Sequence, residues 1–154
     1  MKEVERIAEQ LRRAWEGEAW HGPALRQILS GLSANGALER PIRSVHTIWE
    51  IVLHITAWEK VAAEALRGTP VNVTDAEDWP VVTSNEDKDW ETTVQALEAG
   101  NGRLRQLILQ FAEERLNETV PGKQYSFYIL LHGMIQHDLF HAGQISLLKK
   151  AMTP

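Results

Sequence analysis

Residues 126–152 read SFYILLHGMIQHDLFHAGQISLLKKAM, and this stretch decides the fold class. Its apolar residues recur with the period of an α-helix, so that one stripe of a long helix faces away from water. Such a helix has to bury its stripe against other elements, and the rest of the chain offers helices rather than strands. We therefore expect an all-α protein.

Three other segments show the same helical periodicity. They are residues 2–15, 47–68 and 84–116. Thr47 and Glu50 fit a capping box at the start of the second segment, and Gly68 suits its end. Four long amphipathic helices joined by loops predict a four-helix bundle, and we expect residues 1–154 to form a single domain.

Shorter features lie between the long helices. A short helix is expected at residues 24–32, followed by a loop at 33–43. The polar connection 69–83 is long enough to cross the end of the bundle. Gly100 and Gly102 are each unfavourable within a helix by about 1 kcal/mol, so we expect a weak point in the third long helix.

The composition argues against nucleic-acid-binding, secreted and membrane proteins. The sequence holds 16 Lys and Arg against 21 Asp and Glu, so a basic surface for nucleic acid is not expected. It has no cysteine, and any thiol must therefore come from a small-molecule partner. The N-terminal segment lacks the apolar core of a signal peptide, and no apolar run approaches the roughly 20 residues of a membrane span. We expect a cytoplasmic protein with no membrane partner.

Three histidines share the inward faces of two helices. Each residue of an α-helix turns the side chain by about 100°, which places His137 and His141 about 40° apart on the apolar stripe of residues 126–152. His54 is centred on the apolar stripe of residues 47–68. We therefore expect a bundle to bring the three side chains together. The remaining histidines have no such position: His21, His46 and His132.

Three neutral imidazoles are a known set of metal ligands. A pair at i and i+4 on one helix can chelate Zn²⁺, Ni²⁺, Fe²⁺ or Cu²⁺, and a third histidine still leaves a position open for water or substrate. A metal also offsets the cost of burying imidazoles without partners. The alternative is that these histidines are hydrogen-bonded core residues, and spacing alone leaves both interpretations open.

Other polar residues lie near the expected site. Glu50, one turn before His54, is our candidate catalytic base or ligand-orienting group, and its alternative role is the acidic partner in the capping box. Gln144 shares the stripe of His137 and can hydrogen-bond a ligand histidine or a substrate, or only pack. Asp138 invites comparison with the H-E-x-x-H zinc proteases, but it points about 100° away from His137. We expect Asp138 behind a ligand or at the surface.

Four stretches of the sequence together resemble the DinB-like family. They are WHGPAL at 20–25, HTIWEIVLHI at 46–55, YSFY at 125–128 and GMIQHDLFHAGQI at 133–145. They occur in the family's order, and the closing His-x-x-x-His-x-Gly-Gln-Ile motif is the most specific of them. Phe140 stands where relatives often carry Tyr, so any hydroxyl supplied there is missing.

The resemblance implies a fold and a metal site. The fold is a four-helix bundle in an up-down-down-up arrangement, with the long connection between the second and third helices, and it is usually a homodimer. The metal is a divalent ion held by His54, His137 and His141, with Zn²⁺ or Ni²⁺ expected first and Fe²⁺ or Mn²⁺ as alternatives.

The resemblance also implies a class of activity. Family members with known activity are mostly thiol-dependent, including S-transferases that use bacillithiol-like cofactors and mycothiol-dependent isomerases, whereas others are labelled as metal-dependent hydrolases. We therefore expect a metal-dependent thiol S-transferase that acts on a small-molecule substrate. The alternatives are a metal-dependent hydrolase and a non-catalytic metal- or ligand-binding module of a stress response.

Overall fold

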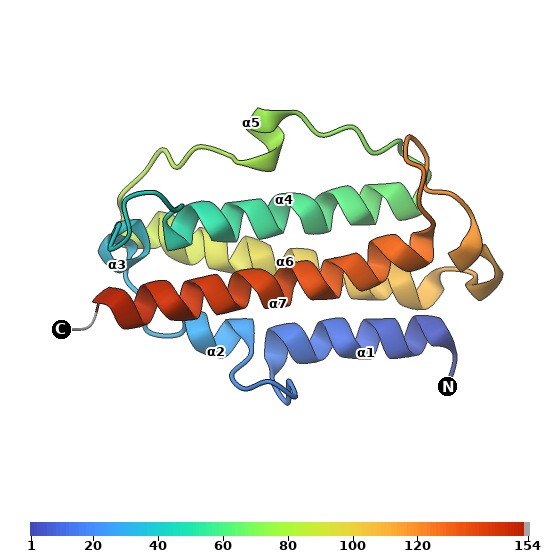
Figure 1. The fold of residues 1–154 in the computed structure, drawn as a ribbon, viewed down its shortest axis with the longest axis horizontal. Helices are drawn as coiled ribbons and strands as arrows, with labels where there is room; N and C mark the ends of the chain where they lie inside the picture. The colour runs from blue at the N-terminus through green and yellow to red at the C-terminus, as the bar shows by residue number, and fades with distance from the viewer. Residues whose placement is uncertain (153–154) are drawn as a thin grey trace.

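The computed structural model describes residues 1–152, and within them it contains helices and loops but no strand (Figure 1). The all-α expectation is confirmed. Four long helices lie side by side: α1 (Glu3–Glu16), α4 (Ile48–Leu66), α6 (Asp87–Gln110) and α7 (Phe127–Met152). The α4 helix packs against α6 and α7, and α1 packs against the same two helices. Over the described residues, no helix combines the length and apolar character needed to span a membrane.

The connection between α4 and α6 runs back along the side of α4 (Figure 1). It contains one helical turn, α5 (Asp75–Asp78), which packs on α4. From its length alone, the connection of residues 69–83 could also cross the end of the bundle. The connection follows the length of α4, because α6 begins at the same end of the molecule as α4. This path brings the connection over the middle of the bundle.

The start of α4 is fixed by the capping box that the sequence predicts. Thr47 Oγ1 accepts a hydrogen bond from the backbone N of Glu50 at 3.2 Å, and the Glu50 carboxylate accepts one from the backbone N of Thr47 at 2.7 Å. Gly68 follows the helix with a φ of +94°, which glycine adopts without strain. These two ends define α4, and His54 lies on its buried face.

Several short elements differ from the sequence prediction. The helix expected at 24–32 is limited to α2 (Leu25–Leu29), and the expected loop 33–43 contains α3 (Ala34–Leu38). The Ser33 hydroxyl accepts a hydrogen bond from the backbone N of Gly36, so a cap within the loop is what starts α3.

The third long helix is also shorter than predicted. It begins at Asp87 and ends at Gln110 rather than covering 84–116, and a 3₁₀ helix (Glu113–Asn117) follows. It ends there because Phe111 takes an extended backbone conformation and is buried against Phe127, with ring centroids 4.8 Å apart. Burying this aromatic pair stabilises the fold more than another turn of α6 would.

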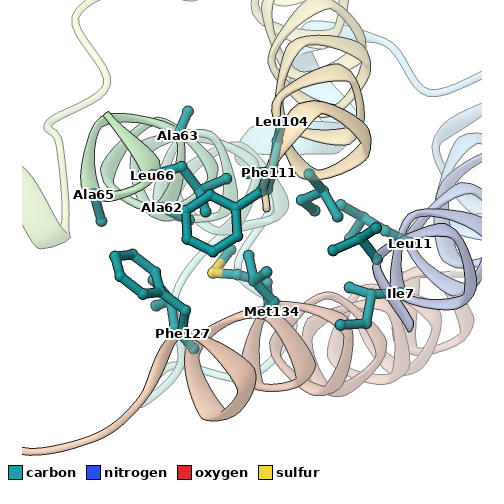
Figure 2. Close-up of a cluster of buried hydrophobic side chains, with 14 of the residues drawn as sticks. Ile7, Leu11, Ala62, Ala63, Ala65, Leu66, Leu104, Phe111, Phe127 and Met134 are labelled. Carbon is teal, nitrogen blue, oxygen red and sulfur yellow. The ribbon is translucent and has the colours of Figure 1, made fainter. Parts of the chain in front are cut away.

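The apolar core falls into two clusters along the bundle. Figure 2 shows one of them, in which Ile7 and Leu11 of α1 and Leu104 of α6 meet Phe127 and Met134 of α7. The other cluster lies further along the same helices and includes Trp15, Ile55, Trp90 and Ile145. Together the two clusters hold the four long helices against one another.

A polar layer separates the two apolar clusters. Its buried members are His54 and Glu59 of α4, Asn101 of α6, and Asp138 and His141 of α7. Asn101 Nδ2 donates a hydrogen bond to Glu59 Oε1 at 2.7 Å. A Cβ at Gly100 would lie only 3.2 Å from Glu59 Oε2, so glycine leaves room for this carboxylate. The glycines that predicted a weak point therefore lie within a continuous α6, next to the polar layer.

Alanine at Gly102 and at Gly100 should affect stability differently. Alanine is favoured over glycine in a helix by about 1 kcal/mol, and a Cβ at position 102 meets nothing within 4 Å. Gly102→Ala should therefore raise the free energy of unfolding by up to about 1 kcal/mol. Gly100→Ala should bring no gain or a loss, because its Cβ presses on Glu59. Urea unfolding measures both, and equal gains would contradict the role assigned to Gly100.

Candidate metal centre

Three histidine side chains meet between α4 and α7. His54 comes from α4, whereas His137 and His141 come from successive turns of α7. Each offers one ring nitrogen, and these three atoms lie within 4.8 Å of one another. His54 and His141 are buried and His137 is partly buried. The expectation that the two helices bring these side chains together is confirmed.

Hydrogen bonds fix the orientation of two of the three rings. His54 Nδ1 donates to the backbone carbonyl oxygen of Asp78 at 2.7 Å, and His141 Nδ1 donates to Gln144 Oε1 at 2.6 Å. Both acceptors are carbonyl oxygens, so both Nδ1 atoms carry the proton of the neutral ring. The Nε2 atom of each ring therefore keeps the lone pair that a metal ion needs.

The spacing of the Nε2 atoms suits a shared ion. His54 Nε2 lies 2.9 Å from His137 Nε2. Two imidazole nitrogens that each bind Zn²⁺ at about 2.0–2.1 Å in tetrahedral geometry lie about 3.3 Å apart, so a small movement of the rings brings this pair to the separation that the ion needs. Imidazole sets of this kind suit Zn²⁺, Ni²⁺ and Fe²⁺. The three side chains therefore fit a divalent metal.

Burial keeps the three imidazoles neutral. Desolvation of the rings lowers the pKa of His54 and of His137. It lowers the pKa of His141 from the usual 6.5 to about 4. A neutral imidazole is the form that binds metal, because the proton of an imidazolium occupies the ligand position. The site is therefore in its ligand form at neutral pH.

The connection between α4 and α6 supplies the neighbours of His54. Trp79 stacks on the His54 ring with centroids 3.9 Å apart, and it also stacks on His46 at 3.6 Å. Asp78 Oδ1 accepts a hydrogen bond from Trp58 Nε1 at 2.6 Å and lies 3.2 Å from His54 Nδ1. Sequence reasoning missed Asp78 and Trp79, because helical periodicity says nothing about a loop. The signal available was the single tryptophan of this connection.

The Glu50 carboxylate already has several partners. In addition to its capping bond with Thr47, it accepts two hydrogen bonds from Arg40 at 2.8 and 2.9 Å. Burial by itself raises the pKa of Glu50, but the Thr47 hydrogen bond and the Arg40 charge outweigh it and hold this pKa below its usual value. The capping role is observed, and the catalytic role of Glu50 stays a prediction.

Asp138 is buried inside the polar layer, with 2% of its surface exposed. Its Oδ1 lies 3.8 Å from His137 Nδ1, and burial raises the pKa of this carboxyl. The surface position that we considered for Asp138 is wrong, because α7 packs against both α1 and α4 and so has more than one inward face. The angle from His137 alone could not reveal this.

Two cavities reach the histidines. The His141 cavity, of about 350 Å³, is lined by His141, Gln144 and Trp79 among others. The His137 cavity, of about 260 Å³, is lined by His137 and Trp58 among others. A larger cavity of about 520 Å³ lies between α4 and the connection, but none of the three histidines lines it. The two smaller cavities are therefore the ones relevant to the metal centre.

Comparison with protein-family models gives a match over most of the chain. A family model described as the DinB superfamily matches residues 19–145, which is most of the chain and includes all three histidines of the site. Searches of curated proteins and of solved structures found no match.

Gln144 should strengthen metal binding through His141. Gln144→Ala removes the acceptor that fixes the His141 ring, so the affinity for Zn²⁺ should fall by about 10- to 100-fold. Gln136→Ala, at an exposed position of the same helix, is the matched control and should leave the affinity unchanged. Competition titration with a chromogenic chelator measures both. Equal affinities for the two variants would show that Gln144 does not orient His141.

The metal-free protein should lose stability on acidification. The unfolded chain protonates His141 near pH 6.5, whereas the folded protein does so only near pH 4, so the unfolded state binds more protons in between. The free energy of unfolding should therefore fall as the pH drops from 6.5 to 4, by about 3 kcal/mol for this ring. Urea unfolding at pH 7.5 and 4 measures the loss. His141→Gln should show a clearly smaller loss, and an equal loss would contradict the assignment.

Proposed function

Because the chain belongs to the DinB superfamily, we propose that it binds a divalent metal ion through His54, His137 and His141. The observation that carries this proposal is the meeting of three neutral imidazoles with two Nδ1 atoms already hydrogen-bonded. Zn²⁺ or Ni²⁺ is the proposed ion, with Fe²⁺ or Mn²⁺ as alternatives. For the fold, the order of the long helices and the connection along α4 support the up-down-down-up four-helix bundle.

The proposed activity is thiol S-transfer to a small molecule. A bound divalent ion would lower the pKa of a thiol or water so that a nucleophile is available near neutral pH. In the reaction a C–S bond forms, the bond from that carbon to its leaving group breaks, the leaving group departs with the electron pair, and the thiol proton is released. Asp78 and Gln144 would hold the His54 and His141 rings during turnover. The sulfur comes from an external thiol, because the chain has no cysteine.

Hydrolysis is the second candidate activity, and it depends on Glu50 as a general base. A hydrolase needs a base that takes a proton from water, and Glu50 is our candidate for this role. Its bonds with Arg40 and Thr47 and its lowered pKa make it a weak base, which favours thiol transfer over hydrolysis. If neither reaction occurs, the site would serve a non-catalytic metal-binding module.

The three histidines should be required for metal binding. After loading with Zn²⁺ or Ni²⁺ and dialysis, the protein should retain about one ion per chain by elemental analysis. His54→Ala and His137→Ala should each lower the affinity by at least about 100-fold, because each removes a direct ligand. His132→Ala is the control for His137→Ala on α7, and it should retain the ion.

The metal-loaded protein should then consume a thiol in the presence of an electrophile. The test for thiol transfer pairs 2-mercaptoethanol with 1-chloro-2,4-dinitrobenzene, and the test for hydrolysis uses 4-nitrophenyl acetate.

Retention of the ion by His54→Ala and His137→Ala would overturn the metal site. A bound ion without turnover of any substrate would overturn the catalytic part alone.

A further inference from the structure

The histidine cluster lies between two cavities that share no lining residue. On α7, the His137 cavity is lined by positions between 129 and 137, whereas the His141 cavity is lined by positions between 140 and 148. The two cavities therefore follow one another along α7, one before and one after the helical turn that joins the two ligands. Each includes a different ligand histidine in its wall.

The connection from α4 to α6 supplies a boundary between the cavities. Asp78 holds Trp58, which is a wall of the His137 cavity, through a hydrogen bond of 2.6 Å. Trp79, the next residue, lines the His141 cavity and stacks on His54. A molecule in either cavity therefore borders on a wall that this dipeptide builds or supports.

The His137 cavity is apolar and uncharged. Ile129 and Met134 supply aliphatic and thioether surface, and Trp58 and Tyr125 supply aromatic surface. None of its described lining residues is Lys, Arg, Asp or Glu. An apolar molecule gains free energy by burying its surface against these side chains, whereas the lining offers a charged molecule no ionic partner. The cavity opens to solvent, and its volume of about 260 Å³ is sufficient for a substituted aromatic molecule to enter from outside.

The His141 cavity has a different lining. Ser44, His46 and Gln144 give it three hydrogen-bonding side chains in addition to the ligand His141. Gln144 Oε1 is bonded to His141 Nδ1, so the amide group has its nitrogen left to donate to a bound molecule. Most of the other lining residues are apolar, but the His141 cavity still offers a polar molecule more hydrogen-bonding groups than the His137 cavity does.

We propose that the His137 cavity is a second binding site at the metal centre and takes a small, uncharged, apolar molecule. The His141 cavity then receives the more polar partner. This inference rests on the proposed function in one respect, since transfer between two molecules needs room for both, whereas hydrolysis needs one molecule and water. The apolar occupant would be the electrophile in thiol transfer.

The cavity can be tested by binding alone, with toluene as the probe. Toluene has no group that binds metal, so its binding reports the cavity itself. Amide chemical shifts in a toluene titration should change saturably around Trp58 and residues 129–137. Gly133→Leu should weaken this binding at least tenfold, because its side chain enters the open space at the cavity wall.

Two variants are matched controls. Gly143→Leu makes the same change on the same helix, also into open space, but position 143 lines neither cavity, so toluene affinity should stay within twofold of the wild type. Leu147→Trp narrows the His141 cavity and should also leave toluene affinity unchanged. Both glycine variants should keep native amide spectra.

The outcome separates this inference from the proposed function. His54→Ala, which should lose the metal, should still bind toluene in the His137 cavity. No saturable shift at those amides, or equal losses in Gly133→Leu and Gly143→Leu, would overturn the second site whether or not metal binds. If toluene binds as expected but no variant of the ligands affects metal retention, the metal site fails and the cavity stands.

Discussion

The hydrogen bond from His54 Nδ1 to the carbonyl oxygen of Asp78 connects the fold to the site. The chain must return along the whole of α4 before it can start α6, and on the way it meets a buried imidazole. The connection fixes the orientation of that ring, and the ring in turn fixes the connection through this bond and the stacking of Trp79. Ligand geometry and loop conformation therefore depend on the same contact.

Most of the fold follows from periodicity and capping. The four long helices could be predicted because their apolar residues recur with the period of a helix. The start of α4 could be predicted because Thr47 and Glu50 cap it. The end of α6 could not be predicted, since it depends on the burial of Phe111 against Phe127, which is distant in sequence. The path of the connection depended likewise on where α6 packs, which no local pattern encodes.

The residues of the candidate site also fall into those that could be predicted from the sequence and those that could not. The meeting of His54, His137 and His141 could be predicted because each lies on an inward stripe of a correctly identified helix. Asp78 and Trp79 could not, because they come from the connection. Glu59 and Asn101 also escaped prediction, since a buried carboxylate is recognisable only once its partner on another helix is known. Periodicity locates a face of a helix, and tertiary contacts decide what that face meets.

The position of α5 over the middle of α4 has an evolutionary consequence. The histidines belong to helices whose spacing is held by two apolar clusters, so their geometry tolerates little change. The segments on either side of α5 are loops, in which insertions and substitutions are tolerated more readily. Changes there that keep Asp78 and Trp79 in place would alter the surroundings of the ligands without disturbing the helices that carry them. One bundle could thus be adapted to different small molecules by variation in a single loop.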